Sequence, residues 1–216
     1  MDRRVRRPRA VGASRPRTAG DGGRGVRILA IDAGHRRSAV SRSVERASRA
    51  AEMAGAEVLR ISLESHDIRF CTGCGICRAS GACKISDDLP ALAEMIRDAD
   101  GIIIGTPGYF RRANNATQAL LDRLGGYFAA HAREAESRAC ARGRHAIIIT
   151  ACSAPEPFAA FFGYSTGPIR ELRRALQLAG IRTVGSLAVT DLWRRPIDEL
   201  DCHKAESLGR ILVGRL

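Results

Sequence analysis

Val26-Arg-Ile-Leu-Ala-Ile31 is a short apolar run with β-branched residues, and Asp32-Ala33-Gly34 follows it directly. A run of this kind is typical of a buried strand that leaves its sheet into a turn. Apolar residues then recur at helical spacing as far as Gly55, a residue that commonly ends helices: Val40, Val44, Ala47, Ala51 and Ala54. The pattern predicts a strand, a loop and a helix.

The same alternation continues along the chain. Further strands are predicted at Ala56–Leu63, Gly101–Thr106, His145–Ala151 and Arg182–Thr190. Helices are predicted at Leu89–Asp98, Ala116–Ala130, Pro168–Leu178 and Ile197–Val213. Alternating strands and helices with continuous Ile/Val runs favour a parallel sheet covered on both faces, and right-handed crossovers restrict the topology. We expect an α/β fold: a doubly wound, five-stranded parallel sheet in a three-layer αβα sandwich.

Length and composition agree with one globular domain. The chain has 216 residues, of which 45% are hydrophobic and 27% charged. A chain of this size can bury a single sizeable core, which excludes collagen-like and disordered classes. Its longest apolar stretches fall far short of the roughly 20 residues that a membrane helix needs.

The positive charge is concentrated at the start of the chain. Residues 1–24 hold eight arginines and two aspartates, a net charge of +6, which is half of the +12 of the whole chain. Since this segment is rich in Gly, Pro, Ser and Ala and has no hydrophobic periodicity, we expect a disordered Arg-rich tail before a domain at 25–216. An over-called start codon is the equal alternative, a transit peptide remains open, and nucleic-acid binding is the least favoured interpretation.

Cysteine usage indicates reduced thiols. Seven cysteines, an odd number, occur without an export signal, and the reducing cytoplasm disfavours structural disulfides. We therefore expect a cytoplasmic protein. Cys140 and Cys202 are expected to be small buried hydrophobic residues.

A compact cysteine motif lies in an insertion at 64–87, between the second strand and the second helix. Its four thiols, Cys71, Cys74, Cys77 and Cys83, fall within thirteen residues, and interspersed glycines allow them to converge. Three cysteines at x2 spacing resemble the first ligands of ferredoxin-type [4Fe–4S] clusters, so a cluster is the favoured interpretation. Metal-free thiols are the main alternative and a four-cysteine zinc site is a further one.

The loop after the first strand has the composition of a phosphate site. Backbone N–H groups, an arginine and hydroxyls before a helix suit an anion, although the loop is neither a P-loop nor a dinucleotide fingerprint. The candidate ligands are Gly34, His35, Arg36, Ser38 and Ser41. Ser38 or Ser41 as a simple helix N-cap is the alternative.

Two further strand ends carry candidate residues. After the third strand, a proline that stops the strand, a glycine and two aromatic residues form a turn that can lie along a planar ring, or an ordinary turn with core aromatics: Thr106, Pro107, Gly108, Tyr109 and Phe110. Beyond the fourth strand, four aromatic residues could wall a ligand pocket, form a subunit interface or belong to a core helix: Phe158, Phe161, Phe162 and Tyr164.

These residues carry a resemblance to a known family. The cysteine motif, Asp87-Asp88, Ala99–Pro107, Tyr109-Phe110 and Leu121-Asp122-Arg123 resemble the flavodoxin-like NAD(P)H-dependent FMN oxidoreductases, and more narrowly their iron–sulfur flavoprotein branch. The resemblance covers about residues 26–190. In that family the loop after the first strand holds the FMN phosphate, and in this chain Arg36 and the Ser41 hydroxyl are kept in kind.

The resemblance implies a flavodoxin-like fold and a flavin-dependent activity. FMN would be held by the loop after the first strand and by Thr106–Phe110, with Ala151 and Cys152 closing over the ring. Hydride would pass from NAD(P)H to FMN and onward to a small-molecule or protein acceptor, with or without an iron–sulfur cluster. Because the flavin carries the chemistry, no catalytic acid–base pair is expected. The family also implies a homo-oligomer, a dimer or tetramer.

Two other functions remain open at this point. A non-enzymatic, flavodoxin-type electron carrier would share the cofactor but not the oxidation of NAD(P)H. A zinc-bearing, nucleic-acid-binding protein would use the cysteines and the basic tail, but the sheet pattern and the flavin-loop resemblance make this the least favoured. No membrane partner is expected.

Overall fold

The computed structural model describes residues 25–80, 83–131 and 144–216. The predicted tail at 1–24 and Cys140 lie outside this range. Parallel strands run side by side in the order β2-β1-β3-β5-β6. Their bounds are Arg27–Asp32 for β1, Glu57–Ser62 for β2, Gly101–Tyr109 for β3, His145–Ala151 for β5 and Arg182–Val189 for β6.

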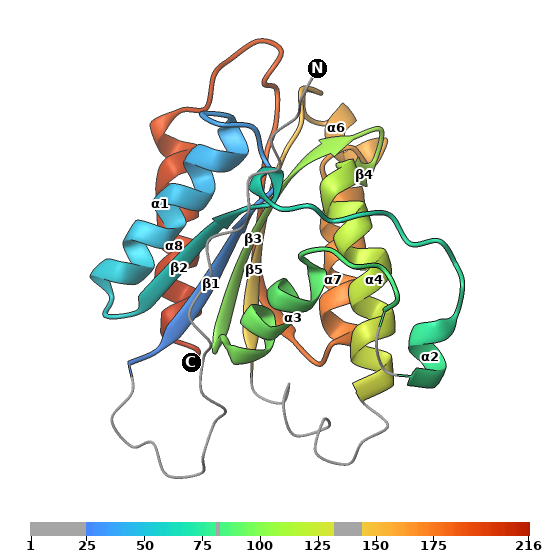
Figure 1. Cartoon of the computed structure of the whole chain (residues 1–216). Coiled ribbons are helices and arrows are strands. Elements are labelled where there is room, and N and C mark those ends of the chain that lie inside the picture. Colours follow the sequence, from blue (N-terminus) through green and yellow to red (C-terminus); the bar gives the residue numbers. More distant parts are fainter. Residues whose placement is uncertain (1–24, 81–82, 132–143) are drawn as a thin grey trace, which may run out of the picture.

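Helices cover both faces of the sheet, which gives the three layers that the sequence predicts (Figure 1). One face carries α1 (Ala39–Met53) and α8 (Glu199–Val213), which also pack on each other. The other carries α3 (Leu89–Asp98), α4 (Asn115–His131) and α7 (Thr166–Leu178). This doubly wound arrangement is the flavodoxin-like α/β fold.

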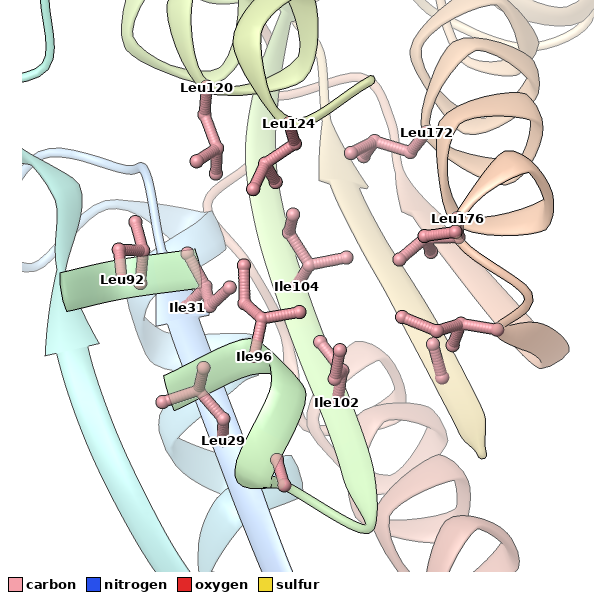
Figure 2. Packing of buried hydrophobic residues seen from close by; sticks show 14 of the residues in the cluster. Leu29, Ile31, Leu92, Ile96, Ile102, Ile104, Leu120, Leu124, Leu172 and Leu176 are labelled. Carbon is pink, nitrogen blue, oxygen red and sulfur yellow. The ribbon is translucent and has the colours of Figure 1, made fainter. Parts of the chain in front are cut away.

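Alternation along each strand divides the core in two. In β1, Leu29 and Ile31 face α3, α4 and α7, whereas Ile28 and Ala30 face α1 and α8. On the first of these faces Figure 2 shows Leu92 and Ile96 of α3, Leu120 and Leu124 of α4, and Leu172 and Leu176 of α7 closing over the strands. Because both faces of the central strands are buried, their sequences read as unbroken apolar runs.

The elements that periodicity did not predict are short. They are a 3₁₀ turn at Leu63–Ser65, α2 (Ile76–Ser80), β4 (Arg112–Ala113) and α6 (Phe158–Phe161). β3 also continues beyond Thr106, so the prediction that Pro107 stops the strand is wrong. Proline's fixed φ suits a strand, and Gly108 and Tyr109 extend β3 by pairing with the antiparallel β4.

No helix in the described part of the chain has the length and apolar character needed to cross a membrane. All six cysteines within the described residues are free, and Cys202 is fully buried in α8 as expected.

Candidate functional site

A hollow of about 760 Å³ opens where β1 and β3 end. The carboxyl ends of neighbouring parallel strands are where doubly wound folds place their ligands. Of the predicted site residues, the hollow is lined by His35, Ser38, Pro107, Tyr109 and Phe110. It therefore brings together residues from the two loops that the sequence singled out independently.

A strained turn forms one wall of this hollow. Phe110 and Arg111 are the two central residues of the β3–β4 hairpin, and both have positive φ, 46° and 71°. Two-residue hairpin turns with this geometry usually contain Asn and Gly, because side chains resist it at a cost of about 1–3 kcal/mol per residue. Phe110 adopts this backbone conformation with a large side chain, and its ring lines the hollow while remaining 88% exposed.

Asn114, which lines the hollow, joins the carboxyl end of β1 to β3. Its Nδ2 donates to the carbonyl of Ala33 after β1 at 2.7 Å, and its Oδ1 accepts from the Thr117 hydroxyl at 2.8 Å. The Oγ1 of Thr106, a fully buried residue inside β3, lies 2.9 Å from the same hydroxyl. Thr106 thus supports the site from below and does not line it.

The loop after β1 folds around Asp32. This carboxylate accepts the N–H of Gly34 at 2.8 Å and the hydroxyl of Ser41. Ser38 is the N-cap of α1, because its Oγ accepts the N–H of Ser41 at 3.2 Å, which is the alternative role that the sequence left open. Burial raises the pKa of Asp32 and outweighs the two hydrogen bonds that lower it.

The basic groups of this loop remain at the surface. Arg36 and Arg37 are exposed beside the N-terminus of α1, a helix with no acidic residue in its first turn. His35 Nδ1 lies 2.9 Å from Glu64 Oε1, so the loop is linked to the segment that follows β2. Arginine charge and a helix N-terminus favour an anion here, and Asp32 opposes one.

Three predicted residues lie beneath the site. Gly108 packs on the carbonyl of Ala151, and Ala151 and Cys152 are buried at the end of β5, where burial raises the pKa of the Cys152 thiol. None of the three lines the hollow. The four aromatic residues predicted beyond the fourth strand do not line it either. Three of them, Phe158, Phe161 and Phe162, are exposed and Tyr164 is half-buried, so the group does not form a core helix.

Sequence reasoning missed several residues that do line the hollow: Glu64, Phe70, Asn114, Asn115, Gln118 and Asp122. The usable signal was the Asn114-Asn115 pair, since two amides at a helix start beside a strand's carboxyl end suit ligand contacts. Phe70 gave no such signal, because the insertion that carries it has no periodicity.

The cysteine loop holds its four thiols at or near the surface. Cys71 and Cys74 are exposed, Cys77 and Cys83 are half-buried, and Gly73 and Gly75 take positive φ values of 69° and 71°. A hydrogen bond from the backbone at Ile76 lowers the pKa of Cys74, which favours the thiolate that binds metals. Among the described residues, no three Cys, His, Asp or Glu side chains are gathered closely enough to hold a metal ion.

One ion pair fastens this loop to α4. Arg123 Nη2 donates to Asp87 Oδ1 at 3.0 Å, Nη1 donates to Asp87 Oδ2, and Nη1 also reaches the carbonyl of Arg69 at 3.1 Å. Burial by itself would lower the pKa of Arg123, but Asp87 and the nearby Cys83 raise it. The arginine therefore touches both arms of the insertion, one before and one after the cysteines.

The hollow fits the flavin ring that the family resemblance implies. A flat aromatic system needs apolar walls and a few amide partners, and Tyr109, Phe110 and Phe70 stand around the hollow with Asn115 at its edge. The loop after β1 offers Arg36 and the α1 N-terminus to a phosphate. The thiols of the insertion have the donor chemistry of an iron–sulfur site.

Comparison with known proteins supports the resemblance to flavin-dependent oxidoreductases. Residues 26–156, more than half of the chain, match the family described as NADPH-dependent FMN reductase. An iron–sulfur flavoprotein of Archaeoglobus fulgidus is 26% identical over 172 residues, which cover 78% of this chain and 70% of that protein. One from Methanocaldococcus jannaschii is 38% identical over 69 residues, 32% of this chain and 36% of its own length.

Solved structures share the fold. The NAD(P)H:quinone oxidoreductase of Methanothermobacter marburgensis superposes with a TM-score of 0.65 at 17% identity, covering 88% of this chain and 100% of that one. A flavone reductase gives 0.68 at 17% identity, over 88% of this chain and 62% of that one. An archaeal flavodoxin gives 0.55 at 9% identity, over 88% and 97%.

Proposed function

The chain belongs to the NADPH-dependent FMN reductase family of oxidoreductases, and from this premise we propose that it is an FMN-dependent NAD(P)H oxidoreductase with a [4Fe–4S] cluster. Electrons would pass from NAD(P)H to a small-molecule or protein acceptor. The observation that carries the proposal is the hollow at the ends of β1 and β3, with a strained aromatic turn on its rim.

The residues around the hollow suit the binding and orientation of FMN. Phe110, Tyr109 and Phe70 offer aromatic surfaces to the flavin ring, and Asn114 holds the two strand ends at a fixed separation. Arg36 neutralises the phosphate next to the α1 N-terminus. When bound, FMN supplies the hydride-accepting chemistry, so the protein needs no acid–base pair of its own.

The cluster ligands are Cys71, Cys74, Cys77 and Cys83. Three observations support this part of the proposal: the relatives are named iron–sulfur flavoproteins, the thiols are free, and Arg123 fixes both arms of the loop against α4. The positive-φ glycines between the first three cysteines permit the tight turns that aim successive sulfurs at one centre.

The proposal extends to assembly and location. Phe158, Phe161, Phe162 and Trp193 expose large aromatic side chains, with Phe161 at 83%, which supports a homo-oligomer, a dimer or tetramer. The six cysteines of the described residues are free thiols, which suits a reducing cytoplasm. Light scattering on the purified protein distinguishes a dimer or tetramer from a monomer.

The decisive experiment is an absorption spectrum with iron and sulfide analysis on anaerobically purified protein, followed by addition of NADPH or NADH. A flavin spectrum that bleaches on addition supports the reductase. A bound flavin that neither nucleotide reduces would favour a flavodoxin-type carrier. Protein that binds no flavin would refute the proposal, and flavin without iron would remove the cluster alone.

A further inference from the structure

A second hollow lies on the other side of the β3–β4 turn. It measures about 370 Å³, is lined by residues of this turn and of α7, and shares Arg112 with the first hollow. Its size falls within the range of small-molecule sites. None of the residues predicted from the sequence lines it.

Arginine dominates this second hollow. Arg111 and Arg112 come from the hairpin, and Arg170 and Arg174, one turn apart, come from α7. Glu171, the one carboxylate among the described residues that line it, accepts the N–H of Ala113 at 3.1 Å and an N–H of Arg112 at 3.4 Å. Within the described residues, Arg111, Arg170 and Arg174 have no acidic partner, so their charges are left to act on a ligand.

The backbone holds these charges in place. A Cβ on Gly167 would lie 2.2 Å from the carbonyl oxygen of Arg111, so only glycine lets the turn rest on the start of α7. The Arg111 side chain in turn lies over Gly163. The positive-φ conformation of the turn thus directs the Phe110 side chain to the first hollow and the Arg111 side chain to the second.

The start of α7 adds to the positive potential. Thr166, its first residue, lines the hollow, the N-cap Ser165 makes no capping bond with its side chain, and the first turn has no acidic residue. A cleft with charges of one sign concentrates the field on its contents, and guanidinium groups match phosphate oxygens in pairs.

We propose that Arg111, Arg170 and Arg174 form a binding site for a phosphate group, separate from the site of FMN. The phosphate has two possible sources: the 2′-phosphate of NADPH or a different phosphorylated molecule. The first source rests on the proposed reductase function, and it would make this cluster the basis for preferring NADPH over NADH. The binding site itself does not depend on that function.

The test measures binding by calorimetry on FMN-saturated protein, so that the loop after β1 is blocked, and on FMN-free protein. The probes are 2′,5′-ADP, 5′-AMP and pyrophosphate. We expect a phosphate-bearing probe to bind, and Arg170→Gln/Arg174→Gln to raise its Kd by about tenfold or more. Arg173→Gln removes an exposed charge from the same helix outside the hollow and is the matched control. Arg170→Lys should retain part of the affinity.

The outcomes separate the sources. Preference for 2′,5′-ADP over 5′-AMP, together with a KM for NADPH that rises in the double variant while the KM for NADH does not, assigns the site to NADPH. Equal binding of the nucleotides and pyrophosphate assigns it to another phosphorylated molecule. If no probe binds, or if the double variant, folded by circular dichroism, binds as the wild type does, the site is refuted. Loss of FMN binding or of reduction would count against the reductase alone.

Discussion

Asp87 and Arg123 lie 36 residues apart in the sequence, and their side chains, 0% and 1% exposed, meet in the ion pair that ties the cysteine loop to α4. Asp87 also accepts the backbone N–H groups of Arg69 and Leu89, at 3.0 Å and 3.2 Å. The carboxylate therefore joins the incoming arm of the loop, its exit and helix α4. Asp88 adds a second link between the two arms of the insertion, because it accepts the N–H of Asp67 at 2.8 Å, but only the Asp87 pair reaches α4 among these contacts.

Breaking the anchor will be costly. Arg123→Gln leaves the buried Asp87 charge without its partner, so we expect the free energy of unfolding to fall by about 3–5 kcal/mol. Urea denaturation followed by circular dichroism measures it. Arg97→Gln breaks the half-exposed pair with Glu94 on α3 and is the control, with an expected loss below about 1 kcal/mol. Equal losses in the two variants would contradict the anchoring role.

The anchor also predicts a pH dependence. Burial by itself would raise the pKa of Asp87, but hydrogen bonds from Arg123, Arg69 and Leu89 lower it below the ordinary 3.8. Because the folded pKa is the lower one, its contribution to stability is present above about pH 3.8 and is lost as the pH falls through the folded pKa. The stability difference between wild type and Asp87→Asn should be constant at neutral pH and shrink in acid. A stability difference that grows in acid would show that the folded pKa of Asp87 is not lowered.

Asp32 predicts a pH dependence of stability opposite to that of Asp87. Burial raises its pKa above the ordinary 3.8, so its stabilising contribution is present below about pH 3.8 and is lost as the pH rises through the folded pKa. Asp32→Asn should therefore stabilise the protein at neutral pH, and the gain should vanish towards pH 3.8. Thermal unfolding at several pH values measures this change.

The same substitution removes a negative charge beside the phosphate loop, so FMN should bind more tightly. Quenching of flavin fluorescence gives the Kd. Glu57→Gln, at the opposite edge of the sheet at the start of β2, removes an equal charge far from the loop and should leave the Kd unchanged. Weaker FMN binding by Asp32→Asn would show that Asp32 supports the ligand.

Phe110→Gly separates ligand binding from stability. Glycine adopts a φ of 46° without strain, so the free energy of unfolding should not decrease. Loss of the aromatic ring removes one stacking partner, so the Kd for FMN should rise by about tenfold. Phe161→Ala removes an exposed ring of α6 outside the hollow and should leave FMN binding unchanged. Unchanged FMN affinity in Phe110→Gly would remove this residue from the site.

Cys77→Ser tests the ligand set. We expect it to lose most of the iron, from about four atoms per chain in a [4Fe–4S] protein. Cys152→Ala changes a buried thiol outside the set, so its iron content should match the wild type. Full iron content in Cys77→Ser would show that the proposed ligands are wrong.

The strands and long helices could be predicted because both faces of β1, β3 and β5 are buried and the helices bury one stripe each, which leaves clear periodicities. The hairpin of β4 could not. Its turn, Phe110-Arg111, lacks the Asn or Gly that usually marks such turns, so the sequence carries no signal for a hairpin here. The hydrogen bond from Ser41 to Asp32 could not be predicted either, because the sequence does not indicate which acceptor a serine hydroxyl meets in the folded protein.

The hairpin turn has a consequence for inhibitor chemistry. Phe110 and Arg111 are joined by a single peptide bond, and successive Cα atoms are about 3.8 Å apart, so the aromatic hollow and the arginine hollow cannot drift away from each other. A flat ring linked through a short, stiff spacer to a phosphonate could occupy both at once. Binding at one end would hold the other end at high effective concentration, so two weak fragments would become one tight ligand.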